Sequence, residues 1–100
     1  MEDLIRLRNE VVEAWHRRDR RAVRELIYET YHLTGDPKVL QILSRRPRKF
    51  ENVITHWIKP LLYYLDNLIE QLQIYSSLKK AIEDSGESEP PENITGEQQK

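Results

Sequence analysis

The chain has 100 residues, a net charge of −1 and no cysteine, with 38% hydrophobic and 33% charged residues. This length fits one domain, and the absence of cysteine excludes disulfides, thiolate metal sites and cysteine nucleophiles. The N-terminus lacks the apolar segment of a secretory signal, and no stretch approaches the roughly 18 apolar residues of a membrane span. We therefore expect a cytoplasmic protein that binds no membrane.

The first third of the chain predicts two helices. Apolar spacing of three and four indicates an amphipathic helix over about residues 3–17, and no strand pattern occurs. A second helix begins after Asp19, a favourable N-cap, and ends at Gly35, which is typical of a helix C-terminus. The alternative is one long rod, because neither Gly nor Pro lies between residues 2 and 34. A rod would carry Asp19 onto the apolar side, which favours a helical hairpin.

Prolines mark the later elements. Asp36 and Pro37 are typical of the N-cap and first residue of a helix, which is expected to be short. Pro47 begins a further helical run, and Pro60 interrupts it, because a proline inside a helix removes a hydrogen bond and clashes with an earlier carbonyl. We expect a kink or restart at Pro60, followed by a long helix to Ile82. The predicted fold class is all-α: a small bundle of four to five helices with a long C-terminal helix.

The last segment, residues 84–100, is rich in Glu, Ser, Pro, Gly and Gln and contains one apolar side chain, Ile94. Such a segment cannot bury enough surface to offset its ordering entropy, so we predict a disordered acidic tail after a helical domain over residues 1–83. The domain carries 15 Lys and Arg against 12 Asp and Glu, whereas the tail carries one Lys against five acids. Either the tail screens the basic surface of the domain, or it only keeps the chain soluble.

An apolar row along the long helix repeats with spacings of four and three and is interrupted by Lys79. It could face the core, or part of it could dock on a partner protein or on a second copy. Since this helix exceeds every other predicted element in length, we expect a homo-oligomer or a protein partner. The predicted interface residues are Leu61, Tyr64, Leu65, Leu68, Leu72 and Tyr75.

Two basic clusters are the candidates for contact with nucleic acid. "HRRDRRAVRE", residues 16–25, has five arginines within eight positions, and "SRRPRK", residues 44–49, precedes the fourth helix. A row of cations next to an aromatic ring can hold a phosphate backbone and stack on a base. The predicted nucleic-acid-binding residues are Arg17, Arg18, Arg21, Arg24, Tyr28, Arg45, Arg46, Arg48 and Lys49.

Other interpretations of these clusters stay open. The arginines could meet acidic protein surface or the chain's own tail, or form an ordinary solvated helix face in which Arg21 pairs with Glu25. A helix-turn-helix motif is not well supported by the sequence. Recognition of a base sequence requires several hydrogen-bond donors at the N-terminal end of the recognition helix. The corresponding helix here is expected to expose only Lys38, Gln41 and Ser44.

No pattern of catalytic chemistry is present. The three glycines, at positions 35, 86 and 96, form no phosphate-binding loop, and His16, His32 and His56 are isolated. We expect no enzyme activity, cofactor, metal or small-molecule substrate. The favoured function is a non-catalytic accessory or adaptor protein that docks through its long helix and contacts nucleic-acid backbone through its arginines. The alternatives are a pure protein–protein interaction module and a small dimeric DNA-binding regulator.

Overall fold

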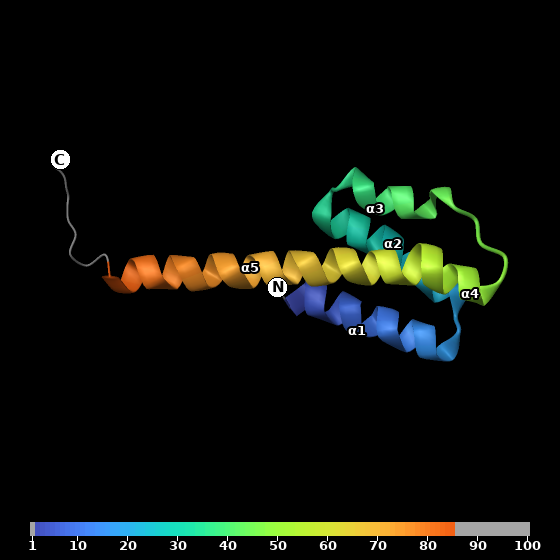
Figure 1. The fold of residues 1–100 in the computed structure, drawn as a ribbon, viewed down its shortest axis with the longest axis horizontal. Helices are drawn as coiled ribbons and strands as arrows, with labels where there is room; N and C mark the ends of the chain where they lie inside the picture. Colours follow the sequence, from blue (N-terminus) through green and yellow to red (C-terminus); the bar gives the residue numbers. More distant parts are fainter. Residues whose placement is uncertain (1, 86–100) are drawn as a thin grey trace. The chain divides into compact units, whose positions relative to one another are not determined.

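The computed structural model describes residues 2–85, and within that range the chain is helical with short connections and no strand (Figure 1). This confirms the all-α fold class with a long C-terminal helix. The predicted tail lies outside the described residues, except for residues 84 and 85, which belong to the last helix. The elements in chain order are α1 (Glu2–Arg17), α2 (Arg20–Thr34), α3 (Pro37–Gln41), the 3₁₀ turn η1 (Ile42–Ser44), α4 (Phe50–Val53), the π-helical turn η2 (Ile54–Ile58) and α5 (Lys59–Ser85).

The chain divides into two units, residues 1–69 and residues 70–100. The first unit contains α1 to η2 and the N-terminal part of α5. The described residues of the second unit, 70–85, are the C-terminal part of α5. No helix among the described residues is both long enough and apolar enough to cross a membrane.

Helices α1 and α2 form the hairpin that the sequence favours (Figure 1). The turn between them places Arg18 in the left-handed backbone region, with φ of 55°. Asp19 then caps α2, because its carboxylate accepts a hydrogen bond from the backbone N–H of Ala22 at 3.1 Å. The cap satisfies a donor that a helix start leaves unpaired, so α2 begins as a new helix after the turn at Arg18 and the two helices do not form one rod.

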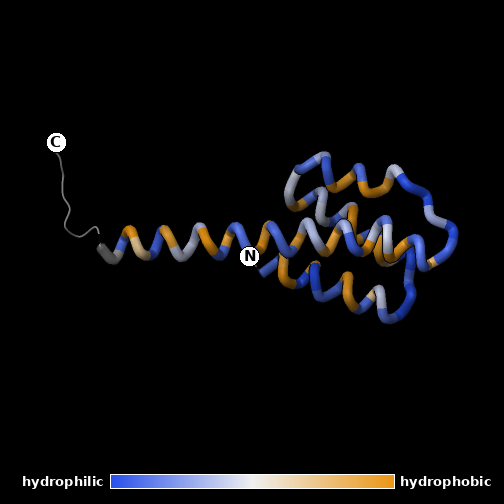
Figure 2. Tube along the Cα trace, viewed as in Figure 1, coloured by the Kyte–Doolittle hydropathy of each residue, from blue (hydrophilic) through white to orange (hydrophobic). Residues whose placement is uncertain are grey.

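The core of the first unit is built from one face of each helix. Figure 2 shows hydrophobic positions recurring between hydrophilic ones along α1, α2 and α5, as expected for amphipathic helices. Thr30 is a buried polar residue, and its hydroxyl donates to the carbonyl of Leu26 at 2.8 Å. An ion pair between Arg8 and Asp66 joins the rims of α1 and α5. The buried apolar residues are Leu4, Leu7, Val11, Ala14, Val23, Leu26, Ile27, Val39, Val53, Trp57, Ile58, Leu61 and Leu65.

Pro60 lies inside a continuous helical segment that begins at Phe50. A π-helical turn, η2, precedes this proline and closes with a hydrogen bond from the N–H of Lys59 to the carbonyl of Ile54. A π turn is wider than an α turn, so it makes room for a ring that would otherwise clash with the carbonyl of His56. The helix therefore passes through Pro60 without a restart.

Candidate nucleic-acid interface

A hollow of about 280 Å³ opens between α2 and the segment that follows α3. Helix α2 contributes Arg20, Arg24 and Tyr28, which lie on one side of the helix because they are spaced by four residues. The opposite wall is formed by Leu43, Arg46 and Trp57. Three guanidinium groups from two separate parts of the chain thus line one concave site.

Trp57 contacts residues on both sides of this site, Arg20 on α2 and Arg45 in the second basic cluster. Its side chain is 3% exposed, and the indole N–H donates a hydrogen bond to the carbonyl of Arg45 at 2.9 Å. This bond ties the segment with the second basic cluster to the helical turn η2. The guanidinium of Arg20 lies 5.3 Å from the centre of the Trp57 ring, a distance typical of a cation–π contact. Arg24 lies in the same way 5.8 Å from the ring of Tyr28.

A second, more open hollow of about 500 Å³ adjoins the first, and Arg46 lines both. Its other lining residues are Arg45, Pro47, Arg48, Lys49, Asn52 and His56. No Asp or Glu among residues 2–83 lines either hollow, and none forms an ion pair with the cations there. We call the six cations of the two hollows the basic surface: Arg20, Arg24, Arg45, Arg46, Arg48 and Lys49.

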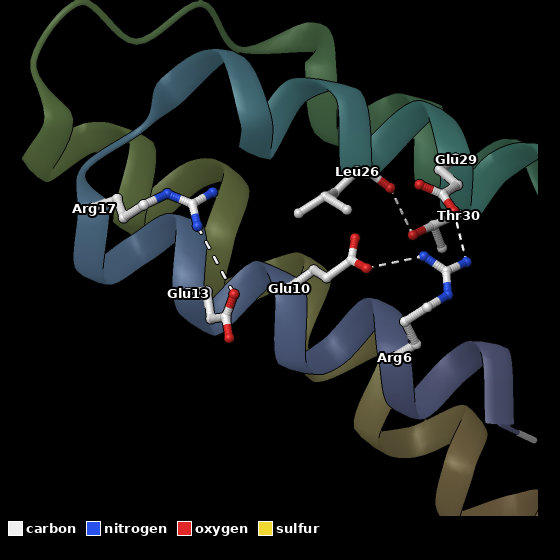
Figure 3. Close-up of polar contacts among 7 residues, drawn as sticks. All are labelled: Arg6, Glu10, Glu13, Arg17, Leu26, Glu29 and Thr30. Atoms are coloured by element: carbon white, nitrogen blue, oxygen red, sulfur yellow. Dashed lines mark hydrogen bonds and ion pairs between the residues drawn. The ribbon is translucent and has the colours of Figure 1, made fainter.

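The structure separates three predicted arginines from the basic surface. Arg17 forms an ion pair with Glu13 at 3.8 Å and lines a groove between α1 and α2 that is rich in glutamates (Figure 3). Arg18 pairs with Glu51 at 3.7 Å and lies over the ring of Phe50. Arg21 is exposed on α2 and lines neither hollow.

The glutamate-rich groove is itself partly neutralised. Arg6 forms ion pairs with Glu10 at 3.1 Å and with Glu29 at 2.7 Å, which bridges α1 and α2 (Figure 3). These contacts raise the pKa of Arg6 above its ordinary value, mainly through the hydrogen bond to Glu29. Carboxylates thus gather on the α1 side of α2, whereas the basic surface lies where α2 meets the later segments.

The other predicted residues line the two hollows: Arg24 and Tyr28 the first, and Arg45, Arg46, Arg48 and Lys49 the second. Sequence reasoning missed Arg20 and Trp57. For Arg20 a signal existed, because residues 20, 24 and 28 share a spacing of four, the period of one helix face. Trp57 carried no such signal, because the sequence does not distinguish a tryptophan that lines a binding site from one that only packs in the core.

The predicted interface on α5 falls on both units. In the first unit Leu61 and Leu65 are fully buried in the core, and Leu68 is half-buried. Tyr64, also half-buried, donates a hydrogen bond from its hydroxyl to Asp36 at 3.0 Å. In the second unit Leu72 is half-buried, while Tyr75 is 63% exposed. Leu61 and Leu65 therefore stabilise the fold, and only the later part of the row is on a surface.

Within residues 2–83, no group of three His, Asp or Glu side chains is placed to hold a metal ion. No known protein family, curated protein or solved structure matches this chain.

Proposed function

We propose that this protein is a non-catalytic accessory protein whose basic surface contacts the phosphate backbone of nucleic acid. One observation carries the proposal: six cations lie around two adjoining hollows into which, among the described residues, no carboxylate projects. Cations without ion-pair partners are free to displace the counterions of a phosphate chain, which is the main source of affinity for nucleic acid. Arginine suits this role because its planar group donates two parallel hydrogen bonds to a phosphate.

The position of the charges favours nucleic acid over an acidic protein surface. The cations of the basic surface come from α2 and from the turn before α4, so a ligand that meets all of them must take a path across both segments and not along a single helix face. A phosphate chain is a continuous line of charge that can follow such a path. A folded acidic protein would need a matching convex shape.

The test measures the fluorescence anisotropy of labelled DNA, single-stranded and duplex, with the full-length chain at about 50 and about 200 mM salt. Two variants on α2 form a matched pair, because both reverse an exposed arginine: Arg24→Glu on the basic surface and Arg21→Glu outside it. We expect wild-type affinity to fall steeply with salt, and Arg24→Glu to weaken binding at low salt by roughly tenfold or more. Arg21→Glu should have a clearly smaller effect.

Equal losses in the two variants would show that binding follows overall charge and not this surface. Absence of binding to either DNA form would refute the proposal. Thermal unfolding of each variant, followed by circular dichroism, controls for loss of the fold.

A second candidate role is docking through the C-terminal part of α5. It is favoured by the large apolar side chains that this part of the helix exposes. Ile74, Tyr75 and Leu78 are each more than half exposed. Their spacing of three and four places them on one face of the helix, and two helices with the same spacing can interlock their side chains. A second copy of the chain has the same face with the same spacing. We therefore propose that this face packs against the same face of a second copy in a homodimer.

A further inference from the structure

We propose that the hollow between Arg20, Arg24 and Arg46 holds one phosphate of a single nucleic-acid strand, with a neighbouring base stacked on Tyr28. The protein then binds single strands more tightly than duplexes. This inference rests on the proposed function and specifies which nucleic acid the basic surface receives.

The three arginines suit a single phosphate. They converge from α2 and from the turn after η1 on a hollow of about 280 Å³. Arg20 and Arg24 are each positioned by an aromatic ring, at 5.3 Å from Trp57 and 5.8 Å from Tyr28. Side chains that are already positioned lose less conformational entropy when they bind. Leu43 and Trp57 also line the hollow.

The aromatic ring available to a base is that of Tyr28. Two aromatic residues line the hollow, and Trp57 is almost fully buried with its N–H already donated to Arg45. Tyr28 in contrast is 40% exposed. Stacking on an exposed ring is the usual way in which proteins bind single strands without sequence preference, because every base has a flat face.

A duplex cannot use this arrangement. Its bases are paired and stacked inside the helix, and turning one out costs a few kcal/mol. A duplex therefore interacts with the cations alone, whereas a single strand gains the stack on Tyr28 as well. The part of the single-strand preference that is lost in Tyr28→Ala measures this contact.

The experiment compares a labelled oligothymidine with a duplex of equal phosphate number, using the full-length chain and three tyrosine variants. We expect wild type to prefer the single strand by roughly tenfold, and Tyr28→Ala to lower single-strand affinity by about the same factor. Binding to the duplex should fall much less, because there Tyr28 contributes only its contact with Arg24. The salt dependence of both should stay the same because no charge is removed. Tyr28→Phe keeps the ring and should retain the affinity. Tyr63→Ala removes a 72% exposed tyrosine that lines neither hollow, and should change nothing.

Three results would overturn the inference. If Arg24→Glu abolishes binding while wild type shows equal affinity for both forms, the basic surface binds nucleic acid without the stacked base, so the proposed function stands and this inference fails. Equal loss of duplex and single-strand affinity in Tyr28→Ala would likewise assign Tyr28 a structural role. If neither nucleic acid binds, both proposals fail.

Discussion

Asp36 connects two parts of the first unit through one carboxylate. One oxygen accepts the backbone N–H of Lys38 at 3.0 Å and caps α3, and the other accepts the hydroxyl of Tyr64 on α5 at 3.0 Å. These bonds lower the pKa of Asp36, chiefly through the backbone N–H of Lys38 and then through Tyr64. The pKa of Tyr64 is raised, mainly by burial and in addition by its bond to Asp36.

This carboxylate predicts a defined acid dependence of stability. Because its pKa is lowered by folding, Asp36 stabilises the fold above the unfolded pKa of about 3.9, and this contribution is lost as pH falls through the lower folded pKa. Asp36→Asn keeps a capping side chain without the charge. We expect the variant to melt below wild type at neutral pH and the two melting temperatures to converge towards about pH 2. A difference that stays constant with pH would contradict this assignment.

At the scale of single elements, Gly35 is the C-cap of α2, directly after its last residue, Thr34. Gly35 has φ of 70°, and its N–H donates to the carbonyl of Tyr31 at 2.7 Å. This left-handed conformation suits glycine, because a side chain there approaches the following carbonyl. Asp36, as N-cap, and Pro37 start α3 immediately afterwards, so Gly35 and Asp36 together form the connection between α2 and α3.

Gly35→Ala isolates the cost of that conformation, because a Cβ atom at Gly35 would meet no atom within 4 Å. We expect the free energy of unfolding to fall by about 1 kcal/mol from backbone strain alone. Gly35→Asn should cost less, since asparagine adopts this conformation more readily. Urea unfolding measures both variants. A loss for alanine as large as that of a core truncation, or no loss, would show that strain at this position is not the deciding factor.

At the scale of the whole molecule, the exposed apolar face formed by Ile74, Tyr75 and Leu78 predicts self-association of the full chain. We expect light scattering to give the mass of a dimer at high protein concentration and of a monomer on dilution. Leu78→Lys places a charge on the apolar face and should leave a monomer with unchanged thermal unfolding under dilute conditions. Gln73→Lys adds the same charge at an exposed polar position and should remain a dimer. A wild-type chain that is monomeric at every concentration would refute the homodimer.

The sequence by itself determined the features that depend on neighbours along the chain. Asp19, Gly35 and Asp36 cap helices at positions that the sequence alone indicates, because caps and turns need only a few adjacent residues. The apolar spacing likewise defines the buried face of each helix. Most of the basic surface could be predicted in the same way, since Arg45 to Lys49 are adjacent in sequence and Arg24 lies one turn before Tyr28.

Only the tertiary structure decided which of these faces meet. Arg20 and Arg46 share one hollow because α2 packs beside the segment after α3, while Arg17 faces glutamates on α1. Leu65 is buried and Tyr75 is exposed, although both belong to one apolar row. Helical periodicity specifies the side of a helix on which a residue lies, but burial and charge neutralisation depend on what covers that side, and this is set by contacts between residues far apart in sequence.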